Sequence, residues 1–196
     1  VPVISGVIKL TAPLFRAILL RLPFGSGTTC FMHNRPAPGP DTASFRHALG
    51  SFGTGVTIAT CRDAAGHPVG ITINSFTSVS LDPPLVLFCL GRNTRAHAAF
   101  LRAEDFAINI LAAAQETQAR HFSGPESTDW SQIQTLPAPA AGPPLLQNCL
   151  SWIVCRRHAV HPGGDHDIFV GAVAALGPPR DTAPLLYFRG QYRLFS

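Results

Sequence analysis

The chain has 196 residues, enough for one domain with a full hydrophobic core; 46% of them are hydrophobic and only 13% are charged. Its formal net charge of +4 arises from 15 Lys and Arg against 11 Asp and Glu, without any long basic run, which excludes a nucleic-acid-binding protein and favours a small anionic ligand. Because average chains carry roughly 25% charged residues, so low a charge content indicates that another subunit covers part of the surface.

The cysteines favour a reducing compartment. None of the five forms a C-x-x-C pair, so we expect free thiols that mostly fill the core, and neither a disulfide framework nor a zinc site. The apolar stretches of the main body are strand-length, well short of the about 18 residues that a membrane-spanning helix needs. The sequence therefore predicts a soluble cytoplasmic protein with no membrane association. The cysteines are Cys30, Cys61, Cys89, Cys149 and Cys155.

Residues 1–40 differ in character from the rest of the chain. An apolar stretch with scattered basic residues at 7–22 is followed by Gly/Ser/Thr-rich and Pro-rich segments, and Met32 is the one methionine. We expect the natural start at Met32 and treat residues 1–40 as an extension, disordered or a start-site artefact, ahead of a domain that spans 41–196. The alternative is an amphipathic membrane-surface helix at 7–22, but Pro13 interrupts it and its charges form no single face. A secretory signal is not apparent.

The first elements of the body are a helix and a hairpin. An apolar stripe at Phe45, Ala48, Leu49 and Phe52 behind N-cap candidates predicts a short amphipathic helix from residue 41. Two β-rich runs at 55–61 and 69–73, joined by a turn at 63–66, predict two antiparallel strands.

The remaining elements continue without a βαβ rhythm. Strands are expected at 84–90, 106–111, 149–160, 167–176 and 185–189, helices at 94–102 and 113–122, a long loop at 123–144 and a turn at 161–165. About seven strands with two or three helices predict a mainly β fold, an antiparallel barrel with attached helices.

Several nucleotide-binding motifs are missing. Neither G-x-G-x-x-G nor G-x-x-x-x-G-K-[ST] occurs, and the Gly53-Thr-Gly55 segment leads into a strand instead of a helix. A nicotinamide or flavin would therefore not be held by a doubly wound parallel sheet.

A segment rich in hydroxyl side chains follows the second strand. Ser75, Thr77, Ser78 and Ser80 are expected on a loop that ends at Asp82-Pro-Pro. Hydroxyl and backbone N–H groups on such a loop can bind a phosphate or the polar rim of a ring system. An ordinary Ser/Thr-rich turn is the alternative.

Two further clusters carry candidate ligand-binding groups. Residues 91–95, Gly-Arg-Asn-Thr-Arg, precede a predicted helix and form a candidate anion site, although a plain N-cap with solvated arginines is equally compatible. Residues 161–167 place His161, Asp165 and His166 on a glycine-rich hairpin, but their spacing fits no standard metal-ligand set. We therefore predict no metal, and an exposed turn is the alternative for His166.

Taken in order, these segments resemble the flavin reductase-like family of FMN-binding split-barrel proteins. The resemblance runs from Phe45 to Arg193 and is carried by residues 45–50 with 52–57, 72–86, 106–111, 164–171 and 185–192. Residues 1–31 have no counterpart in the family, and Asn93 stands where a second hydroxyl residue is common.

The resemblance implies a homodimeric split β-barrel with flavin near the subunit interface. It places Thr72, Asn74 and Ser75 at the isoalloxazine ring and Ser78 and Ser80 at the ribityl chain or phosphate. It also implies a nicotinamide site with His166 as the catalytic residue. It places Arg92, Asn93 and Thr94 at the phosphate end of the flavin, and Asp165, Arg189 and Tyr192 on the nicotinamide side with His166. Phe76 and Thr77 are further implied cofactor contacts.

The implied activity is NAD(P)H-dependent reduction of flavin. The flavin is FMN or FAD, the reductant is NADH or NADPH, and the expected partner is a separate flavin-dependent monooxygenase that receives the reduced flavin. A reductase that keeps its flavin bound and reduces another acceptor, and a non-catalytic flavin-binding protein, are the alternatives.

Overall fold

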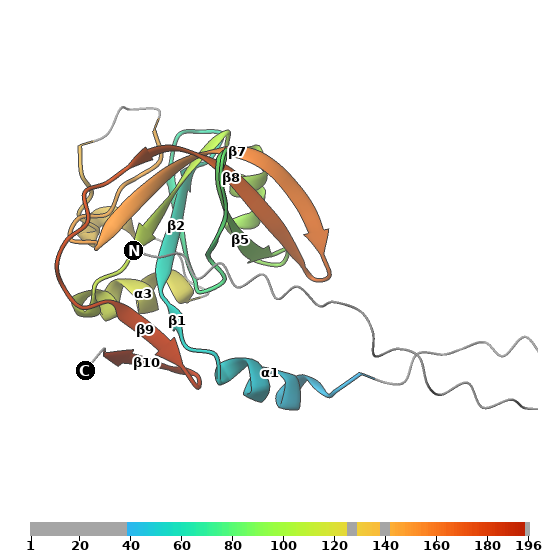
Figure 1. Cartoon of the computed structure of the whole chain (residues 1–196). Helices are drawn as coiled ribbons and strands as arrows, with labels where there is room; N and C mark the ends of the chain where they lie inside the picture. The colour runs from blue at the N-terminus through green and yellow to red at the C-terminus, as the bar shows by residue number, and fades with distance from the viewer. Residues whose placement is uncertain (1–38, 125–128, 138–141, 195–196) are drawn as a thin grey trace, which may run out of the picture. The chain divides into compact units, whose positions relative to one another are not determined.

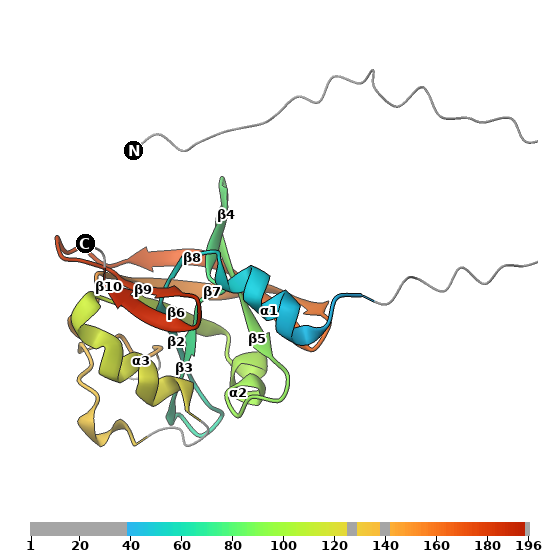
Figure 2. The ribbon, with the colours of Figure 1, turned by 90° about the horizontal axis from the view of Figure 1, so that it is seen from below.

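The computed structural model describes residues 39–124, 129–137 and 142–194, so the expectations for residues 1–38, including a start at Met32 and a helix at 7–22, lie outside the described residues. Residues Pro40–Ser196 form one unit. Its α-helices and strands are labelled in Figures 1 and 2. In chain order the elements are α1 (Thr42–Gly50), β1 (Thr54–Gly55), β2 (Thr57–Arg62), β3 (Pro68–Ile73), β4 (Thr77–Leu81), β5 (Pro84–Gly91), α2 (His97–Arg102), β6 (Asp105–Ile110), the 3₁₀ turn η1 (Ala113–Gln115), α3 (Glu116–Ser123), the 3₁₀ turn η2 (Trp130–Gln132), β7 (Ser151–Gly163), β8 (His166–Leu176), β9 (Leu185–Phe188) and β10 (Gln191–Leu194).

The strands form two antiparallel sheets. The larger sheet has the order β3-β2-β6-β7-β8-β5-β4, and a smaller sheet has the order β1-β9-β10. The larger sheet curves so that β3 approaches β5, although the two strands form no backbone hydrogen-bond ladder. Ser75, which follows β3, connects them through its side chain. Its hydroxyl donates to the Cys89 carbonyl at 3.0 Å and accepts from the Cys89 N–H at 2.9 Å. The predicted antiparallel barrel with attached helices is confirmed.

Several predicted elements differ from the structure: strand β10 was not predicted, and β7 extends to Gly163 through most of the turn expected at 161–165. Two further differences affect the candidate ligand-binding segments. The segment expected as a hydroxyl-bearing loop contains strand β4, which pairs with β5 at the sheet edge because Thr77, Val79 and their neighbours fit a pleated strand. The helix expected from residue 94 begins at His97, and its N-cap Ala96 makes no side-chain hydrogen bond. Helix α2 has only six residues and starts after the Arg92-Asn93-Thr94 turn. Its dipole therefore does not support the anion site predicted at this turn.

The core is built around four phenylalanines. Phe88 of β5 stacks on Phe169 of β8, with ring centroids 5.2 Å apart, and meets Phe100 and Phe106 edge-on. Each of the four side chains is almost completely buried. Gly171 is required beside them, because a Cβ there would lie 2.4 Å from the Phe106 ring.

The described cysteines are free thiols, and most of them lie in the core. Cys61, Cys89, Cys149 and Cys155 are free, and three of them are buried. Burial raises the pKa of Cys61 and Cys155 to about 12 and that of Cys149 to about 11. None of the helices in residues 39–124, 129–137 and 142–194 combines the length and apolar character that crossing a membrane demands.

Candidate functional site

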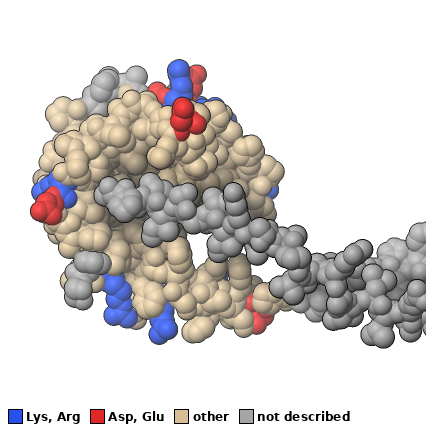
Figure 3. Space-filling view, in the orientation of Figure 1, with Lys and Arg blue, Asp and Glu red and all other residues tan. Residues whose placement is uncertain are grey.

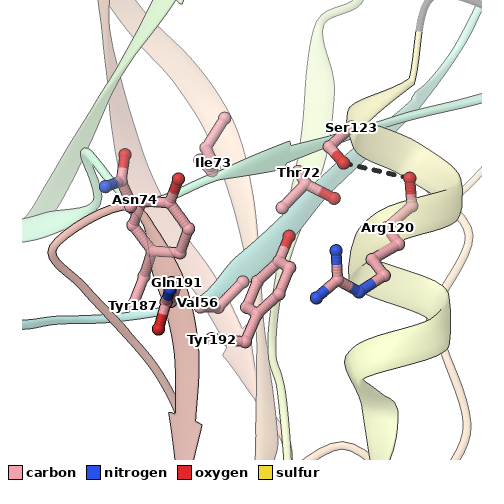
Figure 4. Close-up of a pocket in the computed structure, with 10 residues that line it drawn as sticks. Val56, Thr72, Ile73, Asn74, Arg120, Ser123, Tyr187, Gln191 and Tyr192 are labelled. Atoms are coloured by element: carbon pink, nitrogen blue, oxygen red, sulfur yellow. Dashed lines mark hydrogen bonds between the residues drawn. The ribbon is translucent and has the colours of Figure 1, made fainter.

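A cavity of about 680 Å³, called cavity 1 here, lies between the end of β3, helix α3 and the β9–β10 hairpin (Figure 4). Strand β3 contributes Thr72 and Ile73 and is followed by Asn74, while α3 contributes Arg120 and Ser123. The helix packs along β3, so these groups meet although the sequence separates them by about fifty residues. The other lining residues are Val56, Tyr187, Gly190, Gln191 and Tyr192.

One wall of cavity 1 is aromatic and cationic. The rings of Tyr187 and Tyr192 come from β9 and β10, with centroids 5.4 Å apart, and the Arg120 guanidinium lies 4.9 Å from the centre of the Tyr192 ring. Arg120 also bonds Glu116 one turn earlier on α3, with Nη2 at 2.6 Å from Oε1. Such a wall can contact a planar ring system by stacking, and its cation can face negative charge on the polar edge of that ring.

The polar groups of β3 and the residues after it differ in their capacity to bind a ligand. Thr72 donates its hydroxyl hydrogen to the Ala119 carbonyl at 2.7 Å, so that oxygen can only accept from a ligand. Ser75 uses its hydroxyl on Cys89 in both directions. Asn74 is exposed at the rim, and its amide can both donate and accept.

A second cavity, cavity 2, has a volume of about 470 Å³ and lies beside the first. It is lined by β3 residues 69–71, by the turn at residues 93–96 and by residues 122–124 at the end of α3. Ser123 lines both cavities, and β3 supplies consecutive residues to each. Gly70 lets α3 approach the strand, because a Cβ there would lie 2.7 Å from the Phe122 ring. An elongated ligand can therefore follow β3 from one cavity to the other.

A nearly buried carboxylate holds the turn that lines cavity 2. Asp167 Oδ1 accepts from Arg92 Nε at 3.0 Å and Nη2 at 2.6 Å, and Oδ2 lies 2.7 Å from His97 Nε2. The Asp167 side chain is 12% exposed. The hydrogen bonds from Arg92, then that from His97, hold the pKa of Asp167 below its usual value. This Asp167 cluster joins β8 to both ends of the β5–α2 connection.

The hairpin between β7 and β8 carries Asp165 and His166. Their side chains bond each other, Asp165 Oδ1 to His166 Nδ1 at 2.7 Å, and this bond lowers the pKa of the Asp165 carboxyl. His166 pairs in register with Gly91, and the Arg92 N–H donates to the Asp165 carbonyl at 3.0 Å. Among the described residues, no three His, Cys, Asp or Glu side chains gather in a group that could hold a metal ion.

The structure brings some of the predicted site residues together and leaves others apart. Thr72, Asn74 and Tyr192 line cavity 1, and Asn93 and Thr94 line cavity 2. The other predicted site residues line neither cavity. Phe76 packs against the core, Ser75 bonds to β5, and Thr77, Ser78 and Ser80 are on β4. Arg92 bonds Asp167, and the β7–β8 hairpin carries Asp165 and His166, while the Arg189 N–H donates to the Gly50 carbonyl.

Sequence reasoning missed four polar lining residues of cavity 1: Arg120, Ser123, Tyr187 and Gln191. The Glu116–Arg120 spacing of four residues is a sequence signal for an exposed helical ion pair, but it does not show that α3 faces β3. Tyr187 lies in a predicted strand, where alternation alone cannot say which face borders a cavity.

Comparison with known proteins identifies the fold and the family. Residues 49–196 match the flavin reductase like domain model. The chain is 41% identical over 152 residues to the reductase subunit HsaB of a flavin-dependent monooxygenase from Rhodococcus jostii, covering 78% of this chain and 77% of that protein. It is 40% identical over 162 residues to the FMN reductase (NADH) SmoA of Agrobacterium fabrum, covering 81% and 88%.

A solved structure shows the same architecture. The NADH:FAD oxidoreductase of Streptomyces globisporus, in complex with NAD and FAD fragments, superposes with a TM-score of 0.75 at 35% identity, covering 80% of this chain and 93% of that one. The split antiparallel barrel, the family match over three quarters of the chain and these identities agree. The chain belongs to the flavin reductase-like family.

Proposed function

We propose that this chain is an NADH-dependent flavin reductase that supplies reduced flavin to a separate flavin-dependent monooxygenase. The observation that carries the proposal is the pair of adjoining cavities along β3 in a chain whose relatives include an FMN reductase (NADH) and a monooxygenase reductase subunit. Both relatives exceed 30% identity and cover more than three quarters of this chain.

The residues of the two cavities fit a flavin mononucleotide. Cavity 1 offers a tyrosine pair, a cation and the amide of Asn74, which suit a planar ring with a polar edge. Cavity 2 offers the Asn93 amide and the Arg95 guanidinium, which suit the phosphate end. A flavin bound there would supply the hydride acceptor, and the residues of the two cavities would orient its ring against the nicotinamide, about 3–3.5 Å from it, and exclude water.

His166 is proposed to contact the nicotinamide, as the family resemblance implies. Its side chain is 47% exposed and its Nδ1 is held by Asp165, which leaves Nε2 for a ligand amide or phosphate. His166→Ala should leave flavin affinity within about three-fold and lower kcat/KM for NADH about ten-fold or more, through loss of one hydrogen bond to a charged or strongly polar group. Stopped-flow reduction of flavin-loaded protein by NADH measures this, and unchanged rates and affinities would remove His166 from the site.

A homodimer is proposed from the apolar face of α1. Phe45 and Leu49 of α1 are 53% and 57% exposed, and Phe52 just after the helix is 75% exposed. Leu81 at the end of edge strand β4 is 79% exposed. The described face in Figure 3 carries few Lys, Arg, Asp or Glu side chains, and those lie near its periphery. A second copy of this chain is the expected occupant, because the family resemblance implies a dimer. A monomeric mass by sedimentation, with flavin binding intact, would contradict it.

The cytoplasm is the proposed location. The four described cysteines are free, as expected where thiols are kept reduced. The proposed reaction also consumes NADH, which is supplied in the cytoplasm.

The activity is tested by following NADH oxidation with FMN, FAD or no added flavin. The proposal expects a rate that rises with added free flavin and a stronger response to NADH than to NADPH. Turnover of bound flavin with some other acceptor, without a response to free flavin, would favour a reductase of a different kind. A yellow protein that is inert to both nucleotides would show a binding protein.

A further inference from the structure

Two arginines occupy one short turn but have different surroundings. Arg92 and Arg95 are three residues apart in the connection between β5 and α2, and on sequence grounds either can serve an anionic ligand. The structure separates their roles by what each guanidinium contacts.

The Arg92 guanidinium is already hydrogen-bonded to a carboxylate of the protein. Two of its nitrogens bond the same oxygen of Asp167, at 3.0 and 2.6 Å, and His97 takes the second oxygen at 2.7 Å. Moving Arg92 onto a ligand phosphate would leave a nearly buried carboxylate with one partner instead of two, which is unfavourable. Arg92 is also absent from the lining of cavity 2.

Arg95 is positioned differently. It is exposed and lines cavity 2, and within the described part of the chain its guanidinium has no carboxylate or carbonyl partner. No Asp or Glu is among the described residues that line this cavity, so the positive charge of Arg95 is not neutralised there. A cation in this situation attracts an anionic group without breaking an existing bond.

The neighbouring groups of the turn are mostly engaged already. Thr94 donates its hydroxyl hydrogen to the Gly91 carbonyl at 2.7 Å and so cannot donate it to a phosphate. The N–H groups of Arg92, Thr94 and His97 also bond carbonyls of the protein. Among the side chains of the turn, this leaves the Asn93 amide and the Arg95 guanidinium as donors.

We propose that Arg95 supplies the positive charge that binds the flavin phosphate, while Arg92 is a positioning residue that, through Asp167, holds the turn carrying Arg95 in place. The inference rests on the proposed function, since it assigns the phosphate end of the flavin to cavity 2. It makes Arg95 the residue that distinguishes FMN from riboflavin, which has the same ring and ribityl chain but no phosphate.

The matched variants Arg95→Gln and Arg92→Gln test this division. Affinities for FMN and riboflavin are measured by titrating apoprotein. Arg95→Gln should weaken FMN binding about five-fold or more, the loss expected of one charge-assisted hydrogen bond to an exposed group, and change riboflavin binding less than about two-fold. Arg95→Lys should retain most of the preference for FMN. Raising the salt concentration should weaken FMN binding to wild type more than to Arg95→Gln.

Arg92→Gln should act through the protein. It should change FMN and riboflavin affinity by the same factor and keep the preference for FMN. Asp167→Asn should have the same effect, and the double variant should add little, because the two residues act as one unit. Titration at a temperature where every variant remains folded separates a positioning role from a general loss of stability, because there a loss of stability alone leaves the affinity of the folded protein unchanged.

Three outcomes would overturn the inference. Loss of the FMN preference in Arg92→Gln, with the preference retained in Arg95→Gln, would transfer the phosphate to Arg92. A wild type that prefers FMN and two variants that both keep the preference would overturn the inference alone. A wild type that binds neither flavin would overturn the proposed function together with it.

Discussion

The Asp167 cluster and the Glu116–Arg120 pair contain the same chemical contact in two different environments. In each, an arginine Nη2 lies 2.6 Å from a carboxylate oxygen. Asp167 is 12% exposed and joins β5, α2 and β8, whereas the Glu116 and Arg120 side chains are 43% and 65% exposed and belong to one helix. The first contact fixes the position of backbone segments, and the second leaves a side chain that can rearrange beside cavity 1.

Burial explains the difference. A carboxylate with little access to water depends on its partners, so removing its charge or theirs disturbs the surrounding structure. An exposed pair within a helix exchanges its contacts with water at little cost. The four predictions below test this contrast in order of decreasing effect.

The largest effect is expected from Asp167→Asn. The amide keeps the shape of the side chain but removes the charge that holds Arg92 and His97, so the thermal midpoint should fall by about 5 °C or more. Differential scanning calorimetry measures this. Asp105→Asn is the matched control, because the Asp105 side chain is 48% exposed and lies 4.0 Å from Arg156. Equal midpoints for the two variants would contradict the contrast.

The second prediction concerns acid stability. The folded state lowers the pKa of Asp167, chiefly through Arg92, so ionised Asp167 stabilises the fold at every pH above its unfolded value near 3.8. This contribution is lost as the pH falls from that value through the lower, folded pKa. The difference in stability between wild type and Asp167→Asn should therefore be constant from neutral pH to about 5 and shrink below about 4. Urea unfolding at several pH values measures it, and a difference that grows in acid would have the wrong sign.

A smaller effect, confined to ligand binding, is expected from Arg120→Ala. The change removes the cation beside Tyr192 and enlarges cavity 1, so KM for flavin should rise about three- to ten-fold. The thermal midpoint should change little because the side chain is mostly exposed. Arg156→Ala serves as the control, since Arg156 is 71% exposed and lines neither cavity 1 nor cavity 2. A fall in stability without a change in KM would assign Arg120 to the fold instead.

The smallest effect is expected from Glu116→Gln. The amide can still contact Arg120, and an exposed pair four residues apart contributes less than about 0.5 kcal/mol to folding. Flavin affinity should stay within about two-fold of wild type. A large loss of either stability or affinity would show that Glu116 fixes Arg120 in the cavity, as Asp167 fixes Arg92.

Much of the fold follows from local patterns. The alternating and continuous apolar runs predicted β2, β3, β5 through β9 and the barrel class, because a half-buried or buried strand needs those side chains. Strand β4 was missed because three of its five residues carry hydroxyls and Asp82-Pro-Pro follows, which together indicated a loop, although Val79 and Leu81 alternate with Ser78 and Ser80. The segment pairs with β5 at the edge of the sheet. The start of α2 was missed because Asn93 and Thr94 look like N-caps, whereas Thr94 bonds back to Gly91.

The candidate site was less predictable because its contacts are long-range. Thr72, Asn74 and Tyr192, which line cavity 1, were predicted as site residues only through the family resemblance. Arg120 reaches cavity 1 only because α3 packs on β3, and Arg92 meets a carboxylate 75 residues away in the sequence. No local pattern distinguishes an arginine with a distant internal partner from one that faces a ligand.

The burial of the thiols affects how readily the enzyme is oxidised during turnover. Reduced flavin released into aerated solution reacts with oxygen and forms hydrogen peroxide, which oxidises cysteine through the thiolate and not the thiol. Because burial holds the pKa of Cys61, Cys149 and Cys155 at about 11 to 12, almost none of these thiols is ionised at neutral pH, and peroxide has little access to them. The fold thereby protects three of its cysteines from the by-product of the reaction proposed for it.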